Sequence, residues 1–238
     1  MSAYLHSVRK MNKFLTSVSA IFVALVTAAS LLGATQAGAQ EIKGNADTGK
    51  TKAAMCIGCH GIGGYQASFP EVYRVPMISG QSAKYISNAL LAYQKGERKH
   101  PTMVSIAASL SEQDMADLAA YYSVHGKIEG ATLAEKANKE PSAAVAALLQ
   151  KGACISCHGA NFAKPIDPSY PKIAGQHADY LTVALKSYKT EGLVKVGRAN
   201  GVMGGIAKQY TNAEMKEMAK YIGSLDGDLK VVPQSKFR

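Results

Sequence analysis

The sequence contains no tryptophan and only four cysteines, and aromatic residues make up 7% of its 238 positions. Four cysteines are too few to staple a secreted chain of this length into a disulfide scaffold. Beyond the N-terminal region, no apolar run approaches the roughly 18 residues that a membrane-spanning helix requires. With 47% hydrophobic residues, 18% charged residues and a net charge of +10, the composition indicates a basic globular protein rather than a disordered one. The four cysteines therefore need a specific explanation.

Residues 1–39 have the pattern of a secretory signal peptide. The basic residues Arg9, Lys10 and Lys13 precede an apolar stretch at 21–32, and an Ala-Gly-Ala segment follows at 37–39. This pattern predicts export to the periplasm, with a retained membrane anchor as the alternative. Free thiols do not persist in an oxidising compartment, so we expect the cysteines to form disulfides, bind a metal or carry a covalent group.

The remainder of the chain contains an internal repeat. The segment CIGCHG at 56–61 recurs as CISCHG at 154–159, and PMISGQ at 76–81 recurs as PKIAGQ at 171–176. Further matched pairs are Tyr85 with Tyr180, Tyr93 with Tyr188, Met103 with Met203, and Met115 with Met215. The offset drifts from 95 to 100 residues, which places small insertions in loops. Duplication therefore predicts two domains, at 40–128 and 129–238.

Each repeat is predicted to be helical. The expected helices are 83–95, 111–124, 143–152 and 211–225, from apolar spacing and from Ser or Thr at the start of the last three. No segment alternates in polarity over a useful length, so strands are not expected. The glycine- and proline-containing stretches 61–80 and 159–175 are predicted to be loops, and 126–141 a linker. The fold class is therefore all-α.

Both copies of C-x-x-C-H have the spacing by which c-type haem is attached. On a short helix, positions i and i+3 share a face, so two thiols reach the two vinyl groups of one porphyrin. Zinc would need a fourth ligand, a thioredoxin-type disulfide would need a strand–helix context, and a structural disulfide would leave His60 and His158 unexplained. We therefore predict two covalently bound haem c groups (iron), attached through Cys56, Cys59, Cys154 and Cys157.

Each haem iron either has a second axial ligand or keeps an open coordination position. Met103 and Met203 occupy equivalent positions in predicted loops before the last helix of each domain. Met77 aligns with a lysine in the second repeat, which argues against it. His100 is a rival in the first domain, although Asn200 stands at its repeat position. Thioether opposite imidazole raises the reduction potential and saturates the iron, which favours electron transfer over catalysis.

Pro76 and Pro171 open the repeated P-x-I-x-G-Q segment. A ligating imidazole usually donates its other N–H to a carbonyl oxygen, which fixes the orientation of the ring. We expect the two prolines to supply that carbonyl to His60 and His158. A rigid turn without this role is the alternative.

Taken together, two C-x-x-C-H units, each followed by P-x-I-x-G-Q, a tyrosine-bearing helix, a methionine and a final helix, resemble the di-haem cytochrome c4 family over residues 45–225. The resemblance implies two tandem class I cytochrome c domains related by a pseudo-two-fold, with the haems facing each other across the interface. It implies His60 with Met103, and His158 with Met203, as axial pairs. It also implies an electron carrier, not an enzyme, that works in the periplasm and delivers electrons toward a terminal oxidase.

Several kinds of partner and two other functions are compatible with this sequence. A similar di-haem chain also occurs as the cytochrome subunit of flavin-containing sulfide dehydrogenases, and a haem enzyme with an open iron site is a further alternative. Expected partners are periplasmic or membrane-bound redox proteins, namely a quinol-oxidising cytochrome complex, a terminal oxidase or a dehydrogenase; a membrane surface is compatible, and nucleic acid is not expected. Basic residues cluster before Met203, at Lys186, Lys189, Lys195 and Arg198. Their positive field predicts acidic partners that dock on the C-terminal domain.

Overall fold

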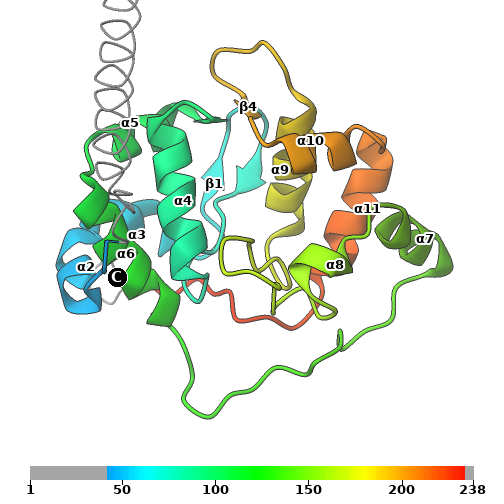
Figure 1. Cartoon of the computed structure of the whole chain (residues 1–238), viewed down its shortest axis with the longest axis horizontal. Helices are drawn as coiled ribbons and strands as arrows, with labels where there is room; N and C mark the ends of the chain where they lie inside the picture. The colour runs from blue at the N-terminus through cyan, green and yellow to red at the C-terminus, as the bar shows by residue number, and fades with distance from the viewer. Residues whose placement is uncertain (1–41, 234–238) are drawn as a thin grey trace, which may run out of the picture. The chain divides into compact units, whose positions relative to one another are not determined.

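The computed structural model describes residues 42–233, so the predicted signal peptide at 1–39 lies outside the described residues. Helices dominate this part of the chain (Figure 1). The first half contains α2 (Ala46–Lys52), α3 (Ala54–His60), α4 (Ala83–Gln94), α5 (Pro101–Ala108) and α6 (Glu112–Val124). The second half contains α7 (Ala143–Lys151), α8 (Ile155–His158), α9 (Ala178–Lys189), α10 (Gly201–Ala207) and α11 (Asn212–Gly223). None of the helices within 42–233 is long and apolar enough to cross a membrane.

The helix starts follow the capping signals of the sequence. Ser111 caps α6 and Thr211 caps α11, each hydroxyl accepting a hydrogen bond from the backbone N–H of the third helical residue. That third residue, Asp114 or Glu214, accepts in return from the backbone N–H of the cap, which completes a capping box. Ser142 caps α7 in the same way through its side chain. The four predicted helices are confirmed, with ends shifted by at most two residues.

The expectation that strands are absent is wrong. In the stretch predicted as a loop at 61–80, β1 (Gln66–Ala67) pairs antiparallel with β2 (Tyr73–Arg74). A second ladder joins the two halves of the chain, where β3 (Arg98–Lys99) pairs antiparallel with β4 (Gly197–Arg198). Ladders of two residues are too short to leave a period-two pattern in the sequence, so sequence periodicity does not detect them.

The predicted loop positions of the two methionines are also wrong. Met103 lies in α5 and Met203 lies in α10. Pro101 occupies the first position of α5, where its fixed φ suits a helix and its missing N–H costs nothing. The side chain of Asn200 caps α10 by accepting from the backbone N–H of Met203. Both helices are short, and α10 contains several glycines, so the sequence did not indicate a helix at either methionine despite these start signals.

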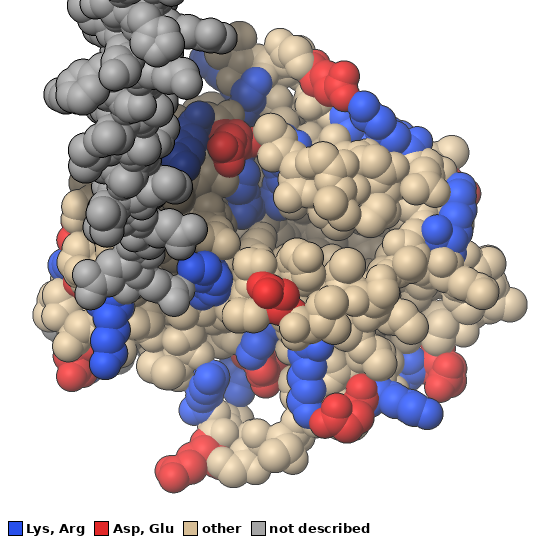
Figure 2. All heavy atoms as spheres, in the orientation of Figure 1, with Lys and Arg blue, Asp and Glu red and all other residues tan. Residues whose placement is uncertain are grey.

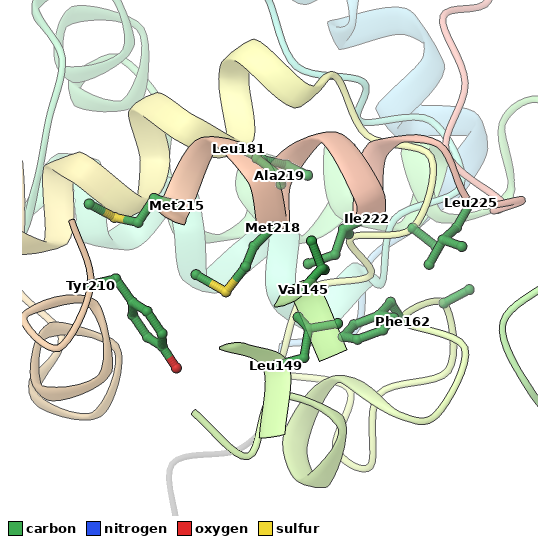
Figure 3. Close-up of a cluster of buried hydrophobic side chains, with 12 residues drawn as sticks. Val145, Leu149, Phe162, Leu181, Tyr210, Met215, Met218, Ala219, Ile222 and Leu225 are labelled. Atoms are coloured by element: carbon green, nitrogen blue, oxygen red, sulfur yellow. The ribbon is translucent and has the colours of Figure 1, made fainter. Parts of the chain in front are cut away.

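Each half of the chain has its own hydrophobic core. In the second half, α11 packs against α7 and contributes Met215, Met218 and Ile222, and Phe162 belongs to the same cluster (Figure 3). The core of the first half is built from Ala53, Ile86, Leu118, Ala119, Tyr121 and Tyr122. Met115 in α6 and Met215 in α11 are repeat equivalents, and both are buried in the core, with exposures of 1% and 0%.

The two halves contact each other through a reciprocal pair of buried glutamines. Gln81 donates from Nε2 to the carbonyl of Lys172 (2.9 Å) and accepts from the backbone N–H of Lys172 (3.0 Å). Gln176 makes the same two bonds with the backbone of Met77 (2.9 and 3.0 Å). Because Gln81 and Gln176 are repeat equivalents, as are Met77 and Lys172, this contact has the isologous form that a two-fold rotation produces. The expected pseudo-two-fold relation is confirmed.

The segment after α11 returns to the first half of the chain (red in Figure 1). The backbone N–H of Lys230 donates to the carbonyl of Ser79 (3.1 Å), and Asp228 forms an ion pair with Lys172 (2.5 Å). Gly80 has a φ of +85°, and a Cβ there would lie 2.3 Å from the carbonyl oxygen of Asp228. Only glycine therefore allows the two backbones to approach this closely.

Asp117 ties the N-terminal helix to α6. Its side chain is buried and accepts hydrogen bonds from the backbone N–H of Asn45 (2.8 Å), Lys52 Nζ (2.7 Å) and Gln113 Nε2 (2.9 Å). The hydrogen bond from Lys52 is the main cause that lowers the pKa of Asp117. At the repeat position in α11, Glu217 is exposed and pairs with Lys220 one turn away (2.8 Å). The repeat thus supplies a matched pair of carboxylates in opposite surroundings.

We expect Asp117→Ala to destabilise the protein by about 3 kcal/mol, because three donors, one of them charged, lose their acceptor. Glu217→Ala should cost less than about 0.5 kcal/mol, as exposed ion pairs usually do. Urea unfolding of the haem-loaded protein measures both. The folded pKa of Asp117 lies below its unfolded value of about 3.9, so its contribution is complete above that pH and is lost as the pH falls through the folded pKa. Equal costs for the two substitutions would contradict this role.

Candidate functional site

A single cavity of about 830 Å³ extends across both halves of the chain. Its volume lies in the range of ligand-binding sites, and its walls are largely apolar. The structure brings all eight predicted site residues to this one cavity, namely Cys56, Cys59, His60, Met103, Cys154, Cys157, His158 and Met203. Residues from sequence positions about 100 apart therefore face a common space.

Both C-x-x-C-H motifs adopt helical backbone conformations. The first motif lies within α3, and the second begins at the N-cap of α8, where Cys154 has helical φ and ψ. The two cysteines of each motif are therefore separated by about one helical turn, as predicted. Burial is the main cause that raises the pKa of the Cys56 and Cys154 thiols. Each motif thus presents two partly buried sulfurs at the cavity wall, followed at once by its histidine.

The carbonyls of Pro76 and Pro171 orient the two motif histidines. His60 Nδ1 lies 2.7 Å from the carbonyl oxygen of Pro76, and His158 Nδ1 lies 3.0 Å from that of Pro171. The predicted role of the prolines is confirmed. Because a carbonyl oxygen only accepts, Nδ1 carries the proton in both rings. Burial lowers the pKa of both histidines more than these hydrogen bonds raise it, so each ring is neutral and keeps the Nε2 lone pair for a metal.

The residues considered for the second axial position also line the cavity. Met103 enters from α5 and Met203 from α10. His100 precedes α5, and both of its ring nitrogens are buried. Its repeat equivalent Asn200 instead caps α10 through its side chain. The methionines are therefore the candidates that the two domains share.

A basic cluster at the domain interface was not anticipated from the sequence. Arg98 and Arg198 pair with each other across β3 and β4. The hydroxyl of Tyr180 accepts from Arg198 (3.0 Å) and, more weakly, from Arg98 (3.5 Å). The Arg98 guanidinium lies 4.7 Å from the ring centre of Tyr93, and that of Arg198 lies 5.4 Å from Tyr188, both within cation–π range. The only hint of this cluster in the sequence is that arginine recurs at an offset of 100 residues, at positions 98 and 198.

This cluster lacks negative charge. Among the described residues, no aspartate or glutamate lines the cavity, and the buried Nε of Arg98 has no hydrogen-bond partner. Burial raises the pKa of Tyr180, but the guanidiniums of Arg198 and Arg98 outweigh it and lower that pKa to about 8. Guanidinium groups stay charged in proteins, so the cavity favours a guest that carries carboxylates.

The donor set fits haem c in each chemical respect. Paired thiols suit covalent attachment, a neutral imidazole suits iron, apolar walls suit the macrocycle, and guanidiniums suit the two propionates that each haem carries. A helical chain with two such sites in tandem domains is a c-type cytochrome that holds two covalent haems.

Comparison with known proteins agrees with this class. The cytochrome c family model matches residues 46–123 and 142–226. Cytochrome c4 of Thiocapsa roseopersicina is 32% identical over 80% of this chain and 97% of its own length. The thiosulfate dehydrogenase electron acceptor of Stutzerimonas stutzeri (strain A1501) is 31% identical over 74% of this chain and 82% of its own. The cytochrome c4 structure from Acidithiobacillus ferrooxidans superposes with a TM-score of 0.54 and 26% identity, covering 73% of this chain and 99% of that one. The chain belongs to the cytochrome c4 family.

Proposed function

We propose that this protein is a periplasmic electron carrier that takes single electrons from one respiratory redox protein and passes them toward a terminal oxidase. The observation that carries the proposal is the shared cavity, because both C-x-x-C-H motifs open into one largely apolar space. Two redox groups held there are neighbours, which suits passage of an electron from one to the other. The cytochrome c4 relatives support the same function.

In this proposal each domain supplies one complete ligand set. Cys56 and Cys59 attach the first haem, and Cys154 and Cys157 attach the second. His60 and Met103 would bind the iron of the first haem, and His158 and Met203 that of the second. When bound, the haem iron supplies a one-electron redox couple. The domain division at 128/129 falls inside the predicted linker 126–141, where the structure shows no helix or strand.

The chain's own residues set the conditions for that couple. The proline carbonyls hold both imidazoles in one orientation and keep the proton on Nδ1. A methionine at the remaining axial position leaves no site for a substrate, so the proposal does not include an enzymatic activity. Apolar walls keep water away, and the arginine cluster compensates carboxylate charge.

A second candidate is the role of dedicated electron acceptor for a dehydrogenase. The relative named as a thiosulfate dehydrogenase electron acceptor favours it over the flavin-containing sulfide dehydrogenase subunit considered from the sequence. Mixing the oxidised protein with a purified thiosulfate dehydrogenase and thiosulfate tests this candidate. Rapid reduction of the haems that requires both enzyme and thiosulfate would support it, and no reduction would exclude it.

The absorption spectrum of the protein expressed in a periplasm tests the leading proposal. We expect two covalent haems per chain, a methionine–iron charge-transfer band in the oxidised state, and no spectral response of the reduced state to carbon monoxide. A carbon-monoxide-binding haem in the unmodified protein would instead indicate catalysis. A chain without covalent haem would overturn the proposal.

A further inference from the structure

The second domain carries a loop that the first domain lacks. In the first repeat, Tyr93 and Arg98 are five positions apart, and their equivalents Tyr188 and Arg198 are ten apart. The five additional residues therefore lie between α9 and β4. The segment Thr190–Val196 of this loop leads into β4, which contains Arg198, the second arginine of the cavity.

The loop and the end of α10 are joined by the Glu191–Lys208 ion pair, and both the loop tip and α10 carry exposed apolar side chains. Leu193 is 54% exposed and Val194 85%, and Val202 of α10 is 68% exposed. We call these three residues the apolar patch. In the described first domain, no large hydrophobic residue between Val72 and Val124 is exposed to a comparable extent, so α5 presents no equivalent. Figure 2 shows uncharged atoms over α10, bordered largely by basic side chains.

The loop is held in place at several points. Lys99 of the first domain donates from Nζ to the carbonyl of Leu193 (2.7 Å). Glu191 forms an ion pair with Lys208 at the end of α10 (2.5 Å), and β4 pairs with β3. A surface that is already ordered loses less entropy when a partner binds.

The apolar patch also borders the haem cavity. Val202 and Val196 both line the cavity, and Val202 directly precedes the proposed ligand Met203. A partner seated on the patch would therefore lie next to the second haem site. A short separation between redox centres is what an electron carrier requires.

The charge around the apolar patch is mainly positive. Lys195 is exposed beside Val194, and Lys208 and Lys151 are exposed at the end of α10, where Lys151 donates to the carbonyl of Gln209 (2.8 Å). The only acid of the loop, Glu191, pairs with Lys208, so these two charges offset each other and Lys195 and Lys151 carry the excess positive charge. This surface differs from the sequence-based expectation, because Arg198 lines the cavity and Lys186 pairs with Glu71 (2.5 Å).

We propose that the apolar patch and its lysine rim are the docking surface for an acidic redox protein. The proposal rests on the proposed electron-carrier function and adds the face on which transfer takes place. An apolar centre with a charged rim is the usual form of a specific interface. Its small area suits a short-lived encounter, and the lysines steer an acidic partner toward it.

Stopped-flow reduction of the oxidised protein by a small acidic [2Fe–2S] ferredoxin, reduced beforehand by one equivalent, tests the docking surface. Lys195→Glu should slow the second-order rate by about fivefold at low salt, and the difference should disappear at high salt because the effect is electrostatic. Leu193→Ser/Val194→Ser should slow the rate by about threefold at both salt concentrations, because it removes apolar contact area. The matched first-domain variants Lys95→Glu and Val72→Ser should have no effect.

The cationic reductant hexaammineruthenium(II) controls for haem integrity, since loop variants should react with it at least as fast as the unmodified protein. Loop variants that match the unmodified protein with ferredoxin, or first-domain variants that slow it equally, would overturn the docking surface alone. Loop-dependent sedimentation with phosphatidylserine vesicles and unchanged ferredoxin rates would assign the patch to a membrane and also overturn it. An unmodified haem-loaded protein that neither reductant reduces would overturn the carrier function itself.

Discussion

Met203→Ala is expected to open the iron site of the second domain. The reduced variant should bind carbon monoxide at one haem of the two, and the midpoint potential of that haem should fall by on the order of 0.1 V. Axial ligands set haem potentials over a range of about 0.8 V, and thioether ligation lies toward its upper end. At the position equivalent to His100 the second domain has Asn200, whose side chain caps α10, so this position supplies no imidazole to the second site.

Met103→Ala should have the same effect on the first haem. In this domain the variant also distinguishes Met103 from the rival ligand His100. The His100 ring nitrogens are buried at the cavity and stand three residues before Met103. The control His100→Ala should leave the spectrum and both potentials unchanged. If His100→Ala opens the first site and Met103→Ala does not, the axial assignment of the first domain is wrong.

Carbon monoxide difference spectra and a potentiometric titration measure these variants, with far-ultraviolet circular dichroism to confirm folding. The two single variants also assign each midpoint potential to a domain, because each should shift one wave and leave the other nearly in place. A variant in which both waves shift equally would show that the two sites do not respond independently.

Arg98→Met is expected to lower the midpoint potentials of both haems. Arg98 and Arg198 face each other across β3 and β4 in the wall of the cavity that both haem sites share. Among the described residues, no carboxylate lines this cavity, so the guanidiniums are its main compensation for carboxylate charge. Loss of one positive charge leaves that negative charge less screened, which favours the oxidised iron.

The size of the effect follows from Coulomb's law. Two unit charges about 8 Å apart interact by about 2 kcal/mol at an effective dielectric constant of about 20. For a one-electron couple this corresponds to roughly 90 mV, because a tenfold change in an equilibrium constant is about 59 mV. Methionine keeps an apolar stem of similar length but not the guanidinium that lies over the Tyr93 ring, so the substitution removes the charge and retains most of the side-chain volume.

Redox titration of Arg98→Met, Arg198→Met and the exposed control Lys95→Met tests this role. The control should shift neither potential measurably at physiological salt, because water and ions screen surface charge. Potentials that stay constant in both arginine variants, with stability reduced, would show that the cluster is only structural. A rise in potential would contradict the charge argument directly.

The local chemistry of each site could be predicted from the sequence. Both cysteines and the histidine of a motif lie within five consecutive residues, so helical geometry alone brings them together. The proline carbonyls lie only 16 and 13 residues from their histidines, and the repeat pointed to both. The capping boxes of α6 and α11 were similarly local. The local predictions that were wrong concern the two-residue strands and the short helices that carry Met103 and Met203. Elements this short leave only a weak pattern in the sequence.

The relation between the two copies was decided by the tertiary structure. The repeat shows that Gln81 and Gln176 are equivalent, but not that each binds the backbone of the opposite copy, 91 and 99 residues away. In the same way, Arg98 meets Tyr180 across 82 residues. A repeat establishes which residues correspond, whereas packing of one copy against the other determines which residues meet. The sequence by itself thus determined two haem sites. The folded interface placed them in one cavity, added Arg98 and Arg198 to its wall and left one exposed loop beside the second site.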